Sequence, residues 1–126
     1  ASDVYKRQVI HLEAAHSLTI HTDPELLKRV IQNILSNCLR YAEHEILIRM
    51  STDGNSLILL IQDDGPGFPE KDLPHIFERF YQGTKKEGST GLGLAIVDSI
   101  CRLQNIGLKY YFQNGEHCFE ISEEQI

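Results

Sequence analysis

The sequence predicts a two-layer α/β sandwich, with strands in one layer and a few long helices in the other. Short segments of alternating apolar and polar residues, typical of strands, occur in the first, middle and last thirds of the chain. Two stretches with helical periodicity separate them. No repeat, low-complexity tract or linker interrupts the 126 residues, so we expect one domain with its own core.

Composition excludes several classes of function. The formal net charge of −6 argues against broad binding to nucleic-acid phosphates. We find no apolar run of about 18 residues and no secretory signal, so a membrane span is not expected. Three cysteines lack metal or redox spacing, and we expect reduced thiols in the core: Cys38, Cys101 and Cys118.

The first third of the chain predicts two strands and a helix. Residues 9–13 and 18–21 alternate as short strands do. A helix follows, with Asp23 as its N-cap and Pro24 at its first position, and ends near residues 41–43. Its apolar residues form one stripe: Leu27, Val30, Ile31, Ile34, Leu35 and Cys38.

A hairpin is predicted next. Residues 45–51 and 57–62 read as strands, and Asp53-Gly54 between them is a turn signal. The second strand, within "LILLIQ", is apolar on both faces, so we expect a central strand that is covered on both sides.

The last half combines a long loop with a helix and a second hairpin. Residues 64–90 are rich in Gly, Pro and charge, and a loop of this length is usually functional or mobile. Residues 91–103 return to helical periodicity. Residues 108–112 and 117–121 then form a hairpin across Asn114-Gly115.

Asparagines on the first helix are the first candidate for chemistry. Asn33 and Asn37 are four residues apart and share a face, and Arg40 and Tyr41 project from nearly the same face, at the shoulder of the apolar stripe. This group is either an exposed polar shoulder or a site at the edge of the core. In the second case the amide oxygens would ligate a hard cation such as Mg²⁺, with phosphates completing the shell.

Two glycine-rich stretches are the other candidates. In "IQDDGPGF", Asp63 is expected to end a strand, and Gly65 and Gly67 either form a turn or let the backbone approach a ligand closely. Adenine is a plausible ligand, because the carboxylate of Asp63 can accept a hydrogen bond from its amino group. In "STGLGLAIV", Gly91 and Gly93 precede a helix, where backbone N–H groups favour anions, although a plain turn is the alternative. The second stretch is neither a Walker loop nor a dinucleotide fingerprint.

The order and spacing of these motifs resemble the ATP-binding catalytic domain of sensor histidine kinases, within the gyrase, chaperone, kinase and mismatch-repair ATPase superfamily. "NILSNCLRYA" resembles the N box, "DDGPGF" and "STGLGLAIV" the two glycine boxes, and "IFERFY" the F box. The resemblance covers residues 17–121. It implies the Bergerat fold: a mixed, mostly antiparallel sheet of about five strands with about three helices on one face.

The resemblance also implies roles for the N box and for the first glycine box. Asn37 would coordinate Mg²⁺ that bridges the ATP phosphates, Asn33 would support or share that role, and Arg40 would reach the phosphates; these three are the expected catalytic group. Tyr41 would line the nucleotide pocket. Asp63 would bind the adenine amino group.

The remaining implied residues form a lid over ATP. Its start would be shaped by Gly65, Gly67 and Phe68, and Phe77 and Phe80 would pack it down. The triphosphate would be held by Thr90, Gly91, Leu92, Gly93 and Leu94. The loop of residues 64–90 would then be a mobile lid ordered by nucleotide.

The residue type at Asn33 indicates which of the family's reactions, ATP hydrolysis or phosphoryl transfer, is expected. Relatives that hydrolyse ATP or phosphorylate serine commonly carry Glu there as a general base, and an amide cannot accept that proton. Phosphoryl transfer to a nucleophilic histidine needs less help from this domain. A nucleotide-sensing module without kinase activity stays open, and an anti-sigma-factor serine kinase is disfavoured by Asn33 and by the long lid.

Partners follow from the same resemblance. The expected acceptor is a histidine on an upstream dimerisation domain that this chain lacks, and a response regulator would take the phosphoryl group onward. We expect no nucleic acid, no direct membrane contact and a monomeric fragment, on the cytoplasmic side of a bacterial parent anchored in the plasma membrane. "HEI" at His44 only faintly resembles an acceptor motif, so a surface loop position is expected for His44.

The chain departs from the family pattern in three places. Gln82 stands where a basic residue often follows the F box, and Lys85 or Lys86 would have to substitute for it. "LQNIG" replaces a common "HGG". Residues 1–8, "ASDVYKRQ", can be back-translated into the end of a common sequencing adapter, so we expect residues 9–126 to be the natural domain, with a charged strand lead-in as the alternative.

Overall fold

A computed structural model of the protein describes residues 9–14, 22–81 and 93–124. Its elements follow one another in this order: β1 (Val9–Ala14), α1 (Pro24–Tyr41), β2 (Glu45–Asp53), β3 (Ser56–Asp63), the 3₁₀ helix η2 (Glu70–His75), α2 (Gly93–Leu103), β4 (Gly107–Gln113) and β5 (Glu116–Glu124). The strand predicted at residues 18–21 lies outside the described residues, as do residues 1–8.

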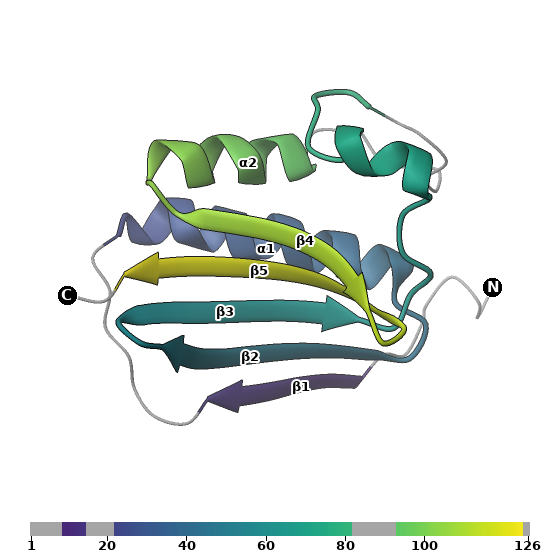
Figure 1. Ribbon diagram of the computed structural model, residues 1–126, viewed down its shortest axis with the longest axis horizontal. Helices are drawn as coiled ribbons and strands as arrows, with labels where there is room; N and C mark the ends of the chain where they lie inside the picture. The colour runs from purple at the N-terminus through teal and green to yellow at the C-terminus, as the bar shows by residue number, and fades with distance from the viewer. Residues whose placement is uncertain (1–8, 15–21, 82–92, 125–126) are drawn as a thin grey trace.

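The strands form one mixed sheet in the order β1-β2-β3-β5-β4. β1 pairs with β2 in parallel, and the other three pairings are antiparallel. Both α-helices lie on the same side of this sheet, and η2 follows the loop beyond β3 (Figure 1). The predicted two-layer sandwich with a mostly antiparallel sheet is confirmed.

Helix α1 begins and ends as its sequence predicts. The Asp23 side chain accepts hydrogen bonds from the backbone N–H groups of Glu25 and Leu26, and Pro24 occupies the first turn. The apolar stripe is buried at Val30, Ile34 and Cys38. This stripe fixes the rotation of the helix, so the polar shoulder faces away from the sheet's centre.

The second hairpin turns at the predicted Asn114-Gly115, whereas the first turns at Gly54-Asn55, because Asp53 is still the last residue of β2. Gly54 between β2 and β3 has a φ of +61°, and Asn114 and Gly115 between β4 and β5 have φ values of +55° and +78°. Left-handed conformations at both central residues of the β4–β5 turn, and at Gly54 in the β2–β3 turn, match the twist of the flanking strands. The turns therefore set the register within each hairpin, between β2 and β3 and between β4 and β5.

The core lies between the sheet and the two helices. Its buried residues come from both α-helices, from β2, β3 and β5, and from the connections after the two helices: Val30, Ile34, Cys38, Ala42, Ile46, Leu59, Ile61, Val97, Ile100, Cys101, Ile106, Phe119 and Ile121. All three cysteines are free and buried, as expected. No helix in the described ranges is both long and apolar enough to cross a bilayer.

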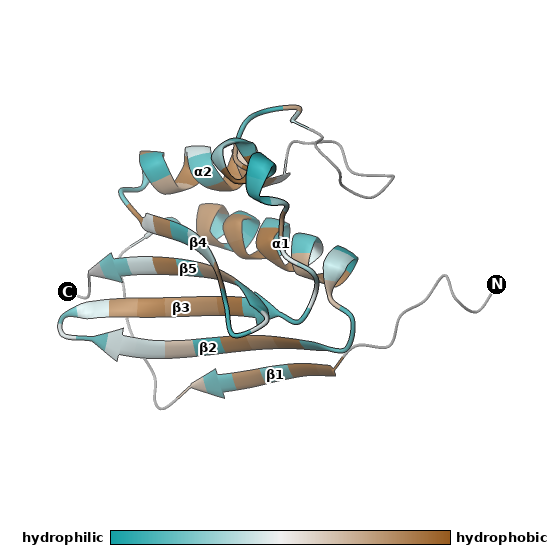
Figure 2. Cartoon of the chain, turned by 45° about the vertical axis from the view of Figure 1, so that its right-hand side comes forward, coloured by the Kyte–Doolittle hydropathy of each residue, from teal (hydrophilic) through white to brown (hydrophobic). Residues whose placement is uncertain are grey.

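Strand β3 is central, but only one of its faces is fully covered. Leu57, Leu59, Ile61 and Asp63 are buried, whereas the alternate residues are half-buried. The expectation of a strand covered on both faces was wrong, because both α-helices lie on the same side of the sheet. β3 is nevertheless apolar along most of its length (Figure 2).

Candidate functional site

The second half of α1 presents the polar shoulder predicted from sequence. Asn37 is half-buried, and its Oδ1 atom is fully buried and accepts no hydrogen bond from the part of the chain that the structure describes. The Nδ2 group of Asn33, one turn earlier, donates to the carbonyl oxygen of Arg29 at 2.8 Å. A buried acceptor without a donor is costly, and a ligand that supplies positive charge would remove that cost.

Asp63 is the last residue of β3 and is completely buried. Its Oδ1 atom accepts the backbone N–H of Gly65 at 2.8 Å. Its Oδ2 atom is buried and accepts no hydrogen bond from a described residue. Burial raises the pKa of Asp63 to about 6, although the Gly65 N–H opposes that rise. The carboxylate is therefore ionised at pH 7 with one oxygen uncommitted.

The glycines after Asp63 have no room for side chains. A β-carbon at Gly65 would collide with the carbonyl oxygen of Tyr41 and would lie 2.8 Å from Asp63 Oδ1. At Gly67, whose φ is +32°, it would lie 2.7 Å from the Phe112 ring. Gly65 therefore allows the chain leaving β3 to pass directly against the last turn of α1, and Gly67 allows it to pass against β4.

The second glycine motif meets the same helix. α2 begins at Gly93, where a β-carbon would lie 3.3 Å from Asn33 Oδ1. Leu94 packs against the core from the first turn of α2. Both glycine motifs therefore converge on α1, one at Tyr41 and the other at Asn33. Thr90, Gly91 and Leu92 lie outside the described residues, as do Gln82, Lys85 and Lys86.

Aromatic residues connect this region to β4 and β5. The Phe68 ring lies edge-on to Tyr41, with centroids 6.3 Å apart, and edge-on to Tyr110 at 5.1 Å. Phe77 packs against the core. Phe80 differs: 60% of it is exposed, its φ is +65°, and the Arg79 guanidinium lies 5.1 Å from its ring centroid. Phe80 is therefore not packed down in this structure.

Two residues that the sequence did not single out complete the site. His117 on β5 pairs in register with Asp63, is 2% exposed, and places Nε2 3.8 Å from Asp63 Oδ1. The Tyr110 hydroxyl lies 2.9 Å from its Nδ1. Burial lowers the pKa of His117 to about 4, so its imidazole is neutral at pH 7. The one signal for His117 in the sequence is that a histidine occurs on a strand face that is otherwise apolar.

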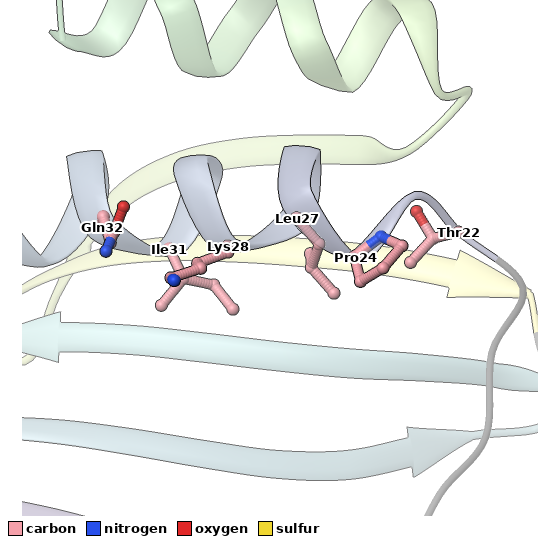
Figure 3. A pocket seen from close by; sticks show the side chains of 6 residues that line it. All are labelled: Thr22, Pro24, Leu27, Lys28, Ile31 and Gln32. Carbon is pink, nitrogen blue, oxygen red and sulfur yellow. The ribbon is translucent and has the colours of Figure 1, made fainter.

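Two other predicted or candidate features lie apart from this site. His44 has a side chain that is 82% exposed and stands 3.3 Å from Asp64, which agrees with a surface loop. An open hollow of about 570 Å³ follows the first half of α1 (Figure 3). It is lined by Thr22, Pro24, Leu27, Lys28, Ile31 and Gln32, none of which is a predicted site residue.

The donor set constrains what could bind. Among the described residues, no three His, Cys, Asp or Glu side chains are grouped closely enough to hold a metal ion alone. The amide oxygen of Asn37 suits a hard cation such as Mg²⁺, but other oxygens would have to come from a phosphate ligand and water. The site therefore fits a metal only together with a phosphorylated ligand.

Comparison with known proteins agrees with this arrangement. Residues 22–123 match the family described as histidine kinase-, DNA gyrase B-, and HSP90-like ATPase. The chain belongs to this family. Sensor histidine kinase YkoH of Bacillus subtilis is 33% identical over 117 residues, which cover 90% of this chain and 26% of YkoH. The protein thus spans about a quarter of the length of that relative.

Solved structures show the same fold. The mycobacterial sensor histidine kinase MprB superposes with a TM-score of 0.77 at 25% identity, over 92% of this chain and 84% of that chain. The catalytic domain of histidine kinase ThkA superposes with a TM-score of 0.83 at 21% identity, over 93% of this chain and 78% of that one. This member of the ATPase family is accordingly an ATP-binding catalytic domain of the two-component sensor histidine kinase type.

Proposed function

We propose that the chain binds Mg·ATP and donates the γ-phosphoryl group to a histidine on a dimerisation domain that lies outside it. One observation carries the proposal: two buried oxygens, Asn37 Oδ1 and Asp63 Oδ2, have no donor among the described residues. The first suits a cation and the second a base amino group, and ATP with Mg²⁺ supplies both.

Asp63 would recognise adenine. Its Oδ1 is occupied by the Gly65 N–H, so Oδ2 is left to accept from the exocyclic amino group. The rings of Tyr41 and Phe68 lie next to the chain that follows Asp63 and would exclude water from the base. A buried, ionised acceptor discriminates strongly because a ligand without the matching donor leaves it unpaired.

Asn37 would hold the metal through its amide oxygen. Mg²⁺, when bound, neutralises charge on the phosphates and orients them. Arg40 follows one turn later in α1 and would contact the same phosphates. Gly93 brings the first turn of α2 to this end of the site, where N–H groups favour anions.

Asn33 sets the type of reaction. Its amide cannot take a proton from water or serine, and its Nδ2 group already donates to Arg29. In the proposed transfer, a nitrogen of the acceptor imidazole forms the new N–P bond while the bond from the γ-phosphorus to the bridging oxygen breaks, and ADP leaves. A response regulator would then accept the phosphoryl group on an aspartate. The chain itself would be a monomer.

Label transfer tests this proposal. A dimerisation domain that carries a histidine is fused upstream of Val9, so that the histidine and the nucleotide site meet within one molecule. ATP labelled in the γ-phosphate is then added. We expect acid-labile label on the fused domain, and none with Asn37→Ala or when the acceptor histidine is replaced. Tight ATP binding without transfer would show a nucleotide-sensing module instead.

A further inference from the structure

Two neighbours of Asp63, Gly65 and His117, determine which of its oxygens is free. Gly65 donates to Oδ1, and His117 Nε2 lies 3.8 Å from the same oxygen. Both nitrogen donors therefore face Oδ1, and the buried Oδ2 is left over. The Cys38 thiol lowers the pKa of the carboxyl slightly, while burial remains the larger effect and raises it.

The neutral imidazole of His117 has one N–H, and its neighbours decide where it sits. Tyr110 Oη lies 2.9 Å from Nδ1 and itself accepts the backbone N–H of Phe68. The tyrosine proton is free to donate to Nδ1, and the opposite tautomer would turn the Nε2 lone pair toward the Asp63 carboxylate 3.8 Å away, so we assign Nδ1 as the acceptor. The imidazole proton then sits on Nε2, the nitrogen that faces Asp63. The N–H and O–H groups of Phe68, Tyr110 and His117 therefore point in sequence toward the carboxylate of Asp63.

We propose that His117, held by Tyr110, is a positioning residue that orients Asp63 and so sets the preference for adenine over purines without a 6-amino group. This inference rests on the proposed binding of adenine by Asp63. Gly65 donates a hydrogen bond to Oδ1 from the loop, and the N–H dipole of His117 faces the same oxygen from β5 at 3.8 Å, which is beyond hydrogen-bond distance. With both N–H groups attracting Oδ1, the carboxylate keeps Oδ2 aimed at the ligand.

The same contacts join base recognition to the loop that follows β3. Gly65 and Phe68 lie two and five residues after Asp63, and each donates its backbone N–H into the network. The loop is thus tied to β3 through Asp63 and to β4 through Tyr110, and these two side chains are buried and half-buried. A change at His117 should therefore alter selectivity without touching the phosphate end of the site, where Asn37 and Arg40 lie.

The test compares the affinities for ATP and inosine triphosphate, which carries no 6-amino group, in the full chain by calorimetry. His117→Phe keeps an aromatic ring without a donor, and His117→Gln replaces the Nε2 donor with an amide N–H. We expect His117→Phe to reduce the ratio of ATP to inosine triphosphate affinity about tenfold, chiefly by weakening ATP, and His117→Gln to restore most of it. Tyr110→Phe should act like His117→Phe in weaker form.

Neighbouring Tyr111 provides the matched control. Its hydroxyl donates to Glu120 on the opposite face of the sheet, so Tyr111→Phe should leave the ratio unchanged. Imidazole ¹⁵N shifts give an independent readout, and we expect the tautomer protonated on Nε2. A His117 protonated on Nδ1, or a ratio that His117→Phe leaves intact, would overturn the inference.

Asp63→Asn separates this inference from the proposed function. If Asp63→Asn removes the preference for ATP but His117→Phe does not, adenine binding by Asp63 stands and the role of His117 is wrong. If Asp63→Asn leaves the preference intact as well, the assignment of Asp63 itself is wrong.

Discussion

The backbone of Gly65 lies directly against the carbonyl oxygen of Tyr41, so a β-carbon at position 65 would overlap an atom that cannot rotate away. This contact joins the chain leaving β3 to the last turn of α1. It places the carboxylate of Asp63 and the amide of Asn37 on neighbouring elements of one site.

Gly65→Ala should therefore damage both the fold and nucleotide binding. Overpacking against backbone typically costs about 1–3 kcal/mol of unfolding free energy, and the displaced loop would carry Asp63 out of position. Urea unfolding and calorimetric titration with Mg·ATP measure the two effects. Gly54→Ala is the control: its φ of +61° imposes strain, but nothing lies within 4 Å, so ATP affinity should not change. Normal ATP affinity in Gly65→Ala would contradict the site.

Asn37→Ala should abolish the Mg²⁺-dependent part of ATP affinity with little loss of stability. The side chain's Oδ1 has no donor among the described residues, so its removal deletes an unsatisfied acceptor rather than a bond. We expect the free energy of unfolding to stay within about 1 kcal/mol of wild type. Exposed Ser36→Ala, one residue earlier on α1, is the control. An Asn37→Ala variant with unchanged Mg·ATP affinity would show that the N-box assignment is wrong.

Adenosine binding should weaken at acidic pH. Burial raises the pKa of Asp63 to about 6, and the carboxylate must be ionised for Oδ2 to accept from adenine while Oδ1 accepts from Gly65. Affinity should therefore be full well above pH 6, be halved at a pH of about 6, and fall by close to tenfold per unit at lower pH. Adenosine is used because it carries no titrating phosphate. NMR titrations from pH 5 to 8 measure the effect.

The variant Asp63→Asn provides the control for this pH dependence. An amide at position 63 does not titrate, so weak adenosine binding that is flat with pH is expected. His117 does not account for the fall, because its pKa is lowered to about 4. A flat profile in the wild-type chain would mean that Asp63 does not contact the base.

Local signals predicted most of the fold. Asp23 and Pro24 mark the start of α1, and the dipeptides at Gly54 and Gly115 mark the hairpins, because each is decided by backbone conformation within a few residues. The coverage of β3 was not predictable in this way. An apolar face on Ile58 or Leu60 gives no information on whether another layer is present.

The site was predictable only where a motif lies along the chain. Asn37, Asp63 and the glycines are visible as spacing, but the contact of Gly65 with Tyr41 depends on how α1 packs on the sheet. His117 escaped notice because its partner Asp63 lies 54 residues away and meets it only through the β3–β5 register. The roles of Asn33, Arg40 and Phe80 stay predictions.

One calorimetric comparison on the wild-type chain tests the central claim, that Asn37 Oδ1 and Asp63 Oδ2 face one nucleotide. ATP is titrated with Mg²⁺ and with EDTA, and inosine triphosphate is titrated with Mg²⁺. We expect Mg·ATP to bind most tightly, with a loss of at least tenfold from removing either the metal or the 6-amino group. Equal affinity under all three conditions, or no binding of Mg·ATP, would contradict the account.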